Sequence, residues 1–455
     1  MIPSTTPPSP ALVARRDADG VFVFPEPVRA EGQRSVLGLA VEPIETLRVG
    51  FVGLGVRGAV AVERFTHLDG AEVRALCDIE TARVEAAQQL LARRGRPAAA
   101  THSGEEGWRT LCERDDVDLV YVCTPWQSHT PLALYAMEQG KHVAVEVPAA
   151  TTLEECWALV DTAERTQRHC MMLENCVYDF FELATLRMAQ EGVLGELLHV
   201  EGAYIHPFGN WERWRLEFNR TRRGDLYATH GLGPACQLLD IHRGDRLDYL
   251  VAVDTPAIGG RAAALRLTGD ATFANGDQTS TLLRTVRGRT VSLQHNVATP
   301  RPYTRRYQVV GSEGFADKYP VEGYAFSARR LAELVPDGGE GCAPDEYLPA
   351  ALRDALAERF RHPIAAEAGD RARRIDTTRG GLNFMMDYRL VYCLRHGLPL
   401  DQDVYDAAEW SSIGPLTALS LAHRSAPVAV PDFTRGDWQK IDGYRHAYAS
   451  SPIRQ

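Results

Sequence analysis

The sequence of 455 residues lacks long hydrophobic runs, basic clusters and paired cysteines. No window approaches 18 uncharged apolar residues, so we expect no transmembrane helix and no membrane partner. Fifty Lys and Arg against sixty Asp and Glu give a formal net charge of −10, which argues against a nucleic-acid partner. The nine cysteines are scattered singly, so neither a disulfide framework nor a metal cluster is expected.

Residues 1–46 differ in composition from the rest of the chain. The first ten residues hold four prolines, and the only apolar run is Val21 to Phe24. We therefore predict an N-terminal arm that is partly disordered or laid over the body. No apolar signal-peptide core follows Arg15 and Arg16, so we expect a cytoplasmic protein whose partner is a small molecule.

Residues 47–174 alternate between strand and helix patterns, which is typical of βαβ units and a parallel sheet. We predict a doubly wound α/β domain here. Strands are expected at 47–52, 72–77, 119–123, 142–146 and 170–173, and helices from 58 to about 67 and at 80–95, 130–139 and 152–167.

From residue 175 the rhythm changes to one helix followed by short alternating strands. This pattern predicts an α+β domain, residues 175–455, with an open, mainly antiparallel sheet. The expected elements are helices at 180–191, 383–396 and 402–421, strands at 197–205, 263–267, 279–286, 290–296 and 307–311, and loops at 206–226 and 336–380.

A glycine motif follows the first strand and opens a helix: Gly53-Leu54-Gly55-Val56-Arg57-Gly58. Such glycines allow a tight turn, and the helix N-terminus offers free N–H groups to a pyrophosphate. Asp78 ends the next strand, 20 residues after Gly58, where a carboxylate accepts the ribose hydroxyls and repels a 2′-phosphate. We therefore predict NAD as cofactor, although nearby Arg83 keeps NADP open. The alternative is that the loop merely turns the chain and Asp78 caps a helix.

Two further segments follow buried strands, at the edge where open α/β sheets bind ligands. One is Cys123-Thr124-Pro125-Trp126-Gln127-Ser128-His129, and the other is Glu146-Val147-Pro148. Glu146 is a candidate to hold the nicotinamide ribose or the substrate; the alternative is that it caps the following turn.

Together these blocks resemble the glucose-fructose oxidoreductase / inositol dehydrogenase / MocA family, which combines an N-terminal Rossmann domain with a C-terminal open antiparallel sheet. Dehydrogenases of that family usually carry Glu-Lys-Pro, and a carboxylate four residues before an active-site His. Here Val147 replaces the Lys, and Leu226 stands four residues before His230. Both departures argue against ordinary sugar-alcohol oxidation.

From about residue 44 the chain is similar to one branch of that family, the NAD-dependent glycosidases of glycoside hydrolase family 109, which are α-N-acetylgalactosaminidase-like. The matching stretches are ENCVY at 174–178, GDLYATHGLGP at 224–234, QHNVATPRPYTR at 294–305 and DVYDAAEWSSIGPL at 403–416. The resemblance implies hydrolysis of N-acetylgalactosaminides or related hexosaminides through transient oxidation at C3, elimination of the C1 group, addition of water and re-reduction. It also implies a homo-oligomer, because an open sheet face needs covering.

The resemblance assigns residues to both ligands. The implied NAD contacts are Val56, Arg57, Asp78, Trp126, Gln127, Ser128, His129, Glu146, Val147 and Asn175, and the implied sugar contacts are Tyr204, Arg215, Tyr227, His230 and Tyr303. His230 with Tyr178 or Tyr227 are the candidates for moving protons at O3 and C2, because His titrates near neutrality and a Tyr does so if a cation lowers its pKa. The division of these roles is left open, and helix-end or core packing is the alternative for each.

Several positions depart from the pattern of the branch. Arg379 and Asn383 stand where His and Asp are typical; Asn296 replaces Asp, Ala228 replaces Pro and His242 replaces Asn. Substrate and anomer are therefore left open. Trp211 and Trp214 lie in a polar stretch, where indoles stack on sugar faces or pack in an interface. A net NAD-dependent sugar dehydrogenase and a non-enzymatic NAD sensor are the alternative functions.

Overall fold

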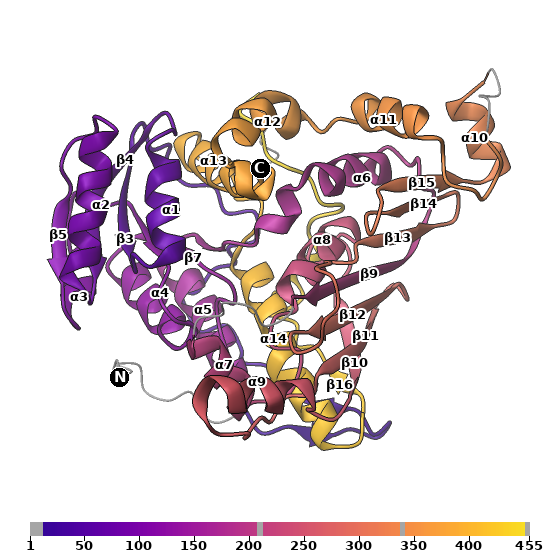
Figure 1. Ribbon diagram of the computed structural model, residues 1–455, viewed down its shortest axis with the longest axis horizontal. Helices are drawn as coiled ribbons and strands as arrows, with labels where there is room; N and C mark the ends of the chain where they lie inside the picture. Colours follow the sequence, from indigo (N-terminus) through magenta and orange to yellow (C-terminus); the bar gives the residue numbers. More distant parts are fainter. Residues whose placement is uncertain (1–11, 207–212, 337–341, 451–455) are drawn as a thin grey trace.

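The computed structural model describes residues 12–206, 213–336 and 342–450. Two sheets organise these residues, and Figure 1 shows the parallel sheet on the left and the larger sheet on the right. Helix α14 (Val404–Ala422) lies between them and contacts both α5 and β10. Within the described ranges no helix combines the length and the apolar character needed to cross a bilayer.

The first sheet has six strands in the order β5-β4-β3-β6-β7-β8, all parallel. Strands β6, β7 and β8 are buried along their whole length, and β3 is buried except at Arg48, because helices connect the strands and cover the sheet. The strands are β3 (Leu47–Val52), β4 (Ala71–Asp78), β5 (Ala100–Ser103), β6 (Leu119–Val122), β7 (His142–Val145) and β8 (Cys170–Met172). The helices are α1 (Val56–Phe65), α2 (Thr81–Arg93), α3 (Gly107–Cys112), η1 (Trp126–Ser128), α4 (His129–Glu138) and α5 (Leu153–Thr166).

The second sheet has ten strands in the order β1-β2-β16-β10-β11-β12-β9-β13-β14-β15. Only β12 with β9 and β16 with β2 are parallel, so the sheet is mainly antiparallel, as predicted. Its strands are β9 (Leu197–Ile205), β10 (Leu247–Asp254), β11 (Gln278–Thr285), β12 (Thr290–Asn296), β13 (Gln308–Gly311), β14 (Gly314–Asp317), β15 (Gly323–Phe326) and β16 (Val428–Ala429).

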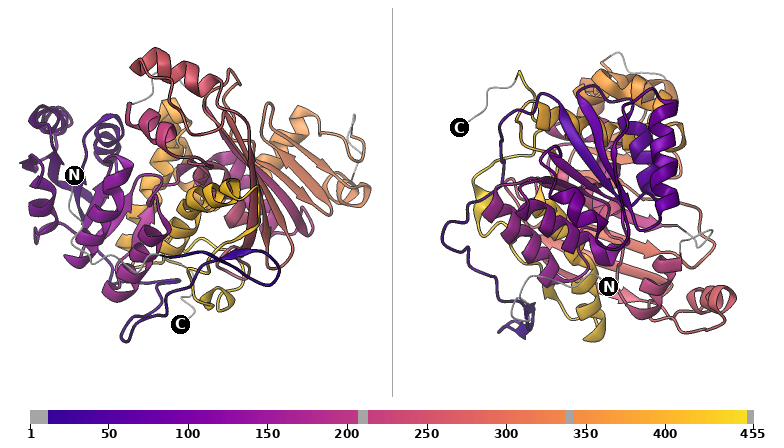
Figure 2. Two further views of the ribbon diagram at one scale, coloured as in Figure 1. Left: turned by 90° about the horizontal axis from the view of Figure 1, so that it is seen from below. Right: turned by 90° about the vertical axis from the view of Figure 1, so that its left-hand side faces the viewer.

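The described part of the N-terminal arm lies on the body. Its two short strands, β1 (Arg15–Arg16) and β2 (Phe22–Val23), extend the ten-stranded sheet beside β16. Figure 2 shows the arm, in indigo, running along the outside of the molecule. Residues from the two ends of the chain therefore complete one sheet.

The predicted strand at 263–267 is wrong, because the structure has helix α9 (Gly259–Thr268) there. Ala, Leu and Arg are strong helix formers, and the Asp277 carboxylate accepts hydrogen bonds from three N–H groups at the helix start, at 2.7–2.9 Å. Gly269 ends the helix in the left-handed region, at φ +79°. The cap lies beyond the helix in sequence, so the local pattern did not reveal it.

The two predicted long loops also contain helices. They are α7 (Arg213–Thr221) in the first and α11 (Ala350–Arg359), α12 (Pro363–Ile375) and η3 (Thr377–Arg379) in the second. The buried face of α12 is built mainly from alanine and carries Ile364 as its one large apolar side chain, so it lacks the large hydrophobic residues that usually mark a core-facing helix. Trp211 lies outside the described residues.

The remaining helices surround the ten-stranded sheet or join the two sheets. They are η2 (Asn175–Tyr178), α6 (Phe180–Gln190), α8 (Thr229–Leu238), α10 (Ala328–Leu334), α13 (Leu382–Arg395) and η4 (Asp437–Gln439). Of these, α13 and α8 both contact η2, the segment that directly follows the last strand of the parallel sheet. This arrangement brings residues from both halves of the chain to one place.

Candidate active site

The glycine motif forms the tight turn that the sequence predicts. Gly53 has φ +89°, and a Cβ on it would lie 2.6 Å from the carbonyl carbon of Cys123 on the neighbouring strand. A Cβ on Gly58 would collide with the Gly53 carbonyl oxygen. Gly55 instead faces open space, with only the Arg83 guanidinium 3.9 Å from a would-be Cβ. Backbone N–H groups at the start of α1 are therefore open to a large ligand.

Asp78 sits beside this loop at the end of β4. Its Oδ2 accepts a hydrogen bond from the Leu54 N–H at 2.6 Å, and its Oδ1 accepts one from the Glu80 N–H at 2.9 Å. Arg83 approaches the same carboxylate at 3.6 Å and pairs with Glu80 at 3.0 Å. The positive charge of Arg83, which kept NADP as an alternative cofactor, is thus partly neutralised by two carboxylates.

A cavity of about 850 Å³ runs along the carboxyl ends of the parallel strands. Of the predicted cofactor residues, it is lined by Gly53, Gly55, Val56, Arg57, Asp78, Trp126, Gln127, Ser128, His129, Glu146 and Val147. The ring of His129 is committed to the backbone, because its nitrogens lie 2.7 Å and 2.6 Å from the carbonyl oxygens of Pro148 and Thr124. A glycine cradle, a carboxylate at the end of β4 and a cavity of this size together fit a dinucleotide.

One end of the cavity is lined by charged and aromatic side chains. Attraction to the Glu146 carboxylate is the main reason why the pKa of Arg57 lies above its ordinary value, so opposite charges lie near each other here. Arg215 from α7 also lines the cavity, and its guanidinium lies 5.9 Å from the Trp126 ring and 5.3 Å from the Tyr227 ring. The cavity therefore ends against residues of the second half of the chain.

Tyr204, Tyr227 and His230 form a compact cluster beyond this end, where Tyr227 contacts Trp126 and Arg215; the three residues do not belong to the cavity lining. The ring centroids lie 4.3 Å apart for the two tyrosines, 4.9 Å for Tyr227 with His230 and 5.5 Å for Tyr204 with His230. Two glycines permit the approach, because a Cβ on Gly202 of β9 or Gly231 of α8 would collide with the other element's backbone. The structure thus brings together three residues that the resemblance assigns to the sugar.

The tyrosines of this cluster do not have the lowered pKa that proton transfer by tyrosinate requires. Burial raises the pKa of Tyr204 and of Tyr227, and the opposing effect of Arg215 and Arg57 is smaller. Both hydroxyls are therefore neutral at physiological pH and act as hydrogen-bond donors.

Tyr303 lies at the rim of the cluster and is 42% exposed. Its ring meets His206 edge-on at 5.5 Å, and His206 stacks on Tyr204 at 5.8 Å. Arg379 is close enough to lower the pKa of both Tyr204 and Tyr303 against the larger effect of burial. The departure from His at position 379 thus places a permanent cation beside the cluster.

Asn175 and Asn383 are joined to each other and not to the cavity lining. The Asn175 amide donates to the Asn383 side-chain oxygen at 2.6 Å, and the Asn383 amide donates to Asp376 at 2.9 Å. Asn296 instead holds a turn after β12, where its side-chain oxygen accepts from the Thr299 hydroxyl at 2.9 Å. The Asn at position 296 therefore stabilises a local turn.

Tyr178 is the predicted proton-transfer residue that the structure does not bring into the cluster. It is fully buried, and its hydroxyl donates to Asp401 at 3.2 Å, a carboxylate that also pairs with Arg389. Burial raises the pKa of Tyr178 well above its usual range. These contacts favour the packing alternative for Tyr178.

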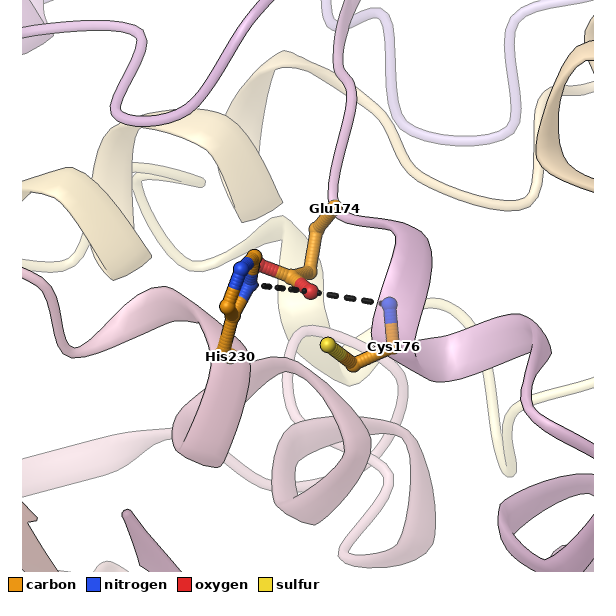
Figure 3. A group of neighbouring side chains, drawn as sticks. All are labelled: Glu174, Cys176 and His230. Carbon is orange, nitrogen blue, oxygen red and sulfur yellow. Dashed lines mark hydrogen bonds and ion pairs between the residues drawn. The ribbon is translucent and has the colours of Figure 1, made fainter. Parts of the chain in front are cut away.

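Glu174 is a site residue that was not predicted from the sequence, and Figure 3 shows its carboxylate beside the His230 ring. The Nδ1 atom of His230 lies 2.7 Å and 2.9 Å from the two Glu174 oxygens, and Glu174 is 0% exposed. The criterion that identified Glu146, a carboxylate just after a buried parallel strand, could also have identified Glu174, which lies just after the last strand of the same sheet. Leu226 lacks the carboxylate expected there, and Glu174 supplies one from another element.

Cys176 lies next to this pair, and the ligand atoms of Glu174, Cys176 and His230 are all within 4.8 Å of one another. By distance alone the three could hold a metal ion. However, the Cys176 thiol donates a hydrogen bond to the Asn175 side-chain oxygen at 3.2 Å, and burial raises the pKa of this thiol well above its usual range. Glu174 and Nδ1 already satisfy each other, so the geometry favours a hydrogen-bonded pair.

A parallel sheet with a glycine cradle, joined to an open mixed sheet, defines a two-domain protein of the NAD-binding oxidoreductase fold. Accordingly, the model described as "Oxidoreductase family, NAD-binding Rossmann fold" matches residues 47–174, and the model described as "Glycosyl hydrolase 109, C-terminal domain" matches residues 178–440. The chain belongs to glycosyl hydrolase family 109. The predicted family, fold class and NAD cofactor are confirmed, while the domain boundaries and site residues stay predictions.

Curated relatives match over almost their whole length. The "Glycosyl hydrolase family 109 protein 1" of Bacteroides fragilis (strain YCH46) is 54% identical, with 93% of each chain covered. The "Glycosyl hydrolase family 109 protein" of Porphyromonas gingivalis (strain W83) is 53% identical, covering 93% of this chain and 92% of the relative. The whole two-domain arrangement is therefore shared with these relatives.

Solved structures share the fold at low sequence identity. Levoglucosan dehydrogenase in complex with NADH and L-sorbose has a TM-score of 0.65 at 18% identity, covering 85% of this chain and 100% of that one. Myo-inositol dehydrogenase from Lactobacillus casei, in complex with NAD(H) and myo-inositol, has a TM-score of 0.56 at 18% identity, covering 86% and 99%. These matches establish the architecture.

Proposed function

We propose that the protein is a glycosidase that hydrolyses N-acetylgalactosaminides or related hexosaminides by NAD-dependent transient oxidation at C3, elimination, water addition and re-reduction. The observation that carries the proposal is that the dinucleotide cavity adjoins the cluster of Tyr204, Tyr227 and His230. Arg215 and Trp126 line the dinucleotide cavity and also contact Tyr227, which packs against His230. A sugar held by the cluster would therefore lie at the end of the cofactor cavity.

Bound NAD⁺ would supply the hydride acceptor for C3 of the sugar and, once reduced, the hydride donor, so hydrolysis would involve no net redox change. His230 is the candidate to accept and return the proton at O3 or C2, because histidine is the side chain that most often serves as a general acid or base. The neutral hydroxyls of Tyr204 and Tyr227 donate hydrogen bonds to sugar or leaving-group oxygens. Arg57 and Arg215 place positive charge where an enolate develops, and Glu146 balances Arg57.

A net NAD-dependent sugar dehydrogenase is the second candidate. The fold shared with levoglucosan dehydrogenase favours it, because the same framework in that protein is described with NADH and a sugar. The two functions differ in their products. A dehydrogenase accumulates NADH from free sugar, whereas the glycosidase releases an aglycone and leaves the cofactor in its starting state.

The test is a panel of nitrophenyl glycosides with both anomers of the galactosaminide, glucosaminide, galactoside and glucoside, each with and without added NAD⁺. Nitrophenol release and NADH absorbance are recorded in the same cuvette. We expect release from a hexosaminide without NADH accumulation. NADH formation from free sugar with no nitrophenol release would select the dehydrogenase, and neither signal would select a non-enzymatic NAD-binding protein.

We also propose that two copies pair through the open face of the ten-stranded sheet. Val253 on β10 and Leu282 on β11 are 56% and 57% exposed, and apolar side chains on a sheet face favour association. Light scattering after gel filtration tests this pairing. We expect a dimer that Leu282→Asp converts to a monomer, and an unchanged mass for the variant would contradict this interface.

A further inference from the structure

We propose that Glu174 is a positioning residue that holds the His230 ring with its Nδ1 protonated, so that Nε2 is the nitrogen offered to the substrate. The proposal rests on the proposed function, because it specifies how the histidine of that site is prepared. Neither the predicted site residues nor the resemblance assigned Glu174 a role.

The hydrogen bonds around Glu174 define the direction of donation. The backbone N–H of Cys176 donates to Oε1 at 2.9 Å, and Nδ1 of His230 lies 2.7 Å from Oε2. An ionised carboxylate only accepts, so Nδ1 must carry its hydrogen. Burial of Glu174 works against its ionisation, but the hydrogen bonds from the Cys176 N–H and from Nδ1 of His230 stabilise the carboxylate, and the pKa of Glu174 is lowered. The carboxylate therefore stays ionised.

The carboxylate is held in place by rigid neighbours. Glu174 lies two residues after the end of β8, and the Gln402 side chain donates to the Glu174 carbonyl at 2.9 Å. On α8, a Cβ on Gly233 would lie 2.9 Å from the Glu174 Cγ, so glycine is needed for helix and carboxylate to pack this closely. Pre-organisation of this kind lets a hydrogen bond orient a catalytic ring.

The rest of the imidazole lies against the tyrosine cluster. Within the described residues, the hydrogen bonds recorded for the His230 ring all involve Nδ1 and Glu174. The ring is 8% exposed and lies between Tyr227 and Tyr204. With Nδ1 protonated, the neutral ring keeps a lone pair on Nε2, which is the form that accepts a proton from the sugar.

The test is Glu174→Gln, which keeps the shape and removes the charge. The Gln oxygen accepts the Cys176 N–H, so its NH₂ group faces Nδ1 and forces that nitrogen to become the acceptor. The hydrogen then moves to Nε2. A wrong tautomer in a comparable carboxylate–histidine pair costs on the order of 10⁴ in kcat, so we expect a fall of about 10² to 10⁴ here. KM and the Kd for NAD should change by less than about threefold.

The matched control is Glu409→Gln, which removes a buried carboxylate from a different histidine, His242. We expect this control to lower the free energy of unfolding while kcat changes by less than about threefold. A kcat for Glu174→Gln near that of the control would overturn the proposal. A loss confined to KM, to NAD binding or to the unfolding midpoint would overturn it too, because each indicates a structural role.

The ¹⁵N resonances of His230, assigned by their loss in His230→Ala, give a readout that needs no turnover. We expect Nδ1–H in the wild type and Nε2–H in Glu174→Gln. An Nε2–H wild type would overturn the proposal. If no glycoside is hydrolysed, the proposed function fails, while the tautomer measurement still decides whether Glu174 positions the ring.

Discussion

Two buried histidines, twelve residues apart, use carboxylates in opposite ways. His242 offers both nitrogens to carboxylates, with Nε2 2.9 Å from Glu409 and Nδ1 3.4 Å from Asp406. His230 offers one nitrogen to Glu174 and turns the rest of its ring toward two tyrosines. A histidine enclosed by two carboxylates is fixed as a cation, whereas one with a single carboxylate keeps a nitrogen for chemistry.

The surroundings of His242 support its structural role. It is 0% exposed, and the Glu409 and Asp406 carboxylates raise its pKa to about 10 against the effect of burial. Arg243 next to it pairs with Asp403 and Asp406 at 3.0 Å and 2.8 Å. The residue has φ +64°, a left-handed conformation in which Asn is the common non-glycine residue.

The largest expected effect comes from His230→Ala. Removing the proton-transfer group should lower kcat by about 10³ to 10⁴, the upper part of the roughly 10² to 10⁴ that general acid–base catalysis contributes. NAD binding and the unfolding midpoint should stay near those of the wild type. Nitrophenol release, NAD titration and urea unfolding measure the three quantities. Loss of NAD or of the fold would make His230 structural and remove the contrast with His242.

His242→Asn should lower the stability of the fold and leave kcat unchanged, the reverse of His230→Ala. Asn tolerates the left-handed backbone but cannot reach both carboxylates, so a buried charge pair is broken at a cost of about 3–5 kcal/mol. The kcat of the folded fraction should match the wild type. Urea unfolding and active-site-normalised rates measure both, and a variant with normal stability but reduced kcat would contradict the assignment.

The His242 contribution should depend on pH. Its folded pKa of about 10 lies above the unfolded value of 6.5, so its stabilisation is complete below pH 6.5 and is lost as pH rises toward 10. The difference in unfolding free energy between wild type and His242→Asn should therefore shrink between pH 6.5 and pH 9.5. A constant difference across this range would show that the His242 charge does not stabilise the fold.

The smallest effect is expected for Tyr178→Phe. It removes one buried hydrogen bond to Asp401, which should cost about 1 kcal/mol of stability. Its kcat should equal that of the wild type, in contrast to Tyr227→Phe, which should lower it. A fall in kcat for Tyr178→Phe as large as that for Tyr227→Phe would restore Tyr178 to the catalytic group.

Local patterns sufficed for five strands of the parallel sheet and for its cofactor edge, but not for the short, largely polar edge strand β5. The first strand, the glycine loop and Asp78 lie within about 30 residues of one another. Their spacing is recognisable because the loop binds the pyrophosphate and the acidic residue binds the ribose of a dinucleotide. The cluster of Tyr204, Tyr227 and His230 came from the resemblance, because its members lie on separate elements of the second half.

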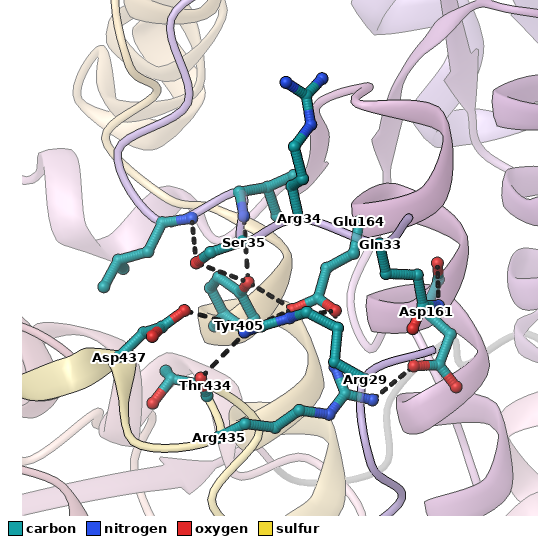
Figure 4. Close-up of polar contacts among 12 residues, drawn as sticks. Arg29, Gln33, Arg34, Ser35, Asp161, Glu164, Tyr405, Thr434, Arg435 and Asp437 are labelled. Atoms are coloured by element: carbon teal, nitrogen blue, oxygen red, sulfur yellow. Dashed lines mark hydrogen bonds and ion pairs between the residues drawn. The ribbon is translucent and has the colours of Figure 1, made fainter. Parts of the chain in front are cut away.

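Long-range partners could not be predicted. Glu174 lies 56 residues before His230, and the Asp277 carboxylate caps α9 from beyond its end. The arm shows the same limit in Figure 4, where Arg29 donates to Glu164 at 2.9 Å and Tyr405 donates to the same carboxylate at 2.7 Å. Arg29 precedes Glu164 by 135 residues, and Tyr405 follows it by 241. Contacts of this range depend on the completed fold.

The most direct measurement uses a cleavable nitrophenyl hexosaminide carrying deuterium at C3. We expect a normal primary isotope effect on kcat/KM, together with loss of hydrolysis when the bound cofactor is stripped and recovery when NAD⁺ is restored. Equal rates for the labelled and unlabelled glycosides, with hydrolysis unaffected by removal of the cofactor, would contradict this expectation.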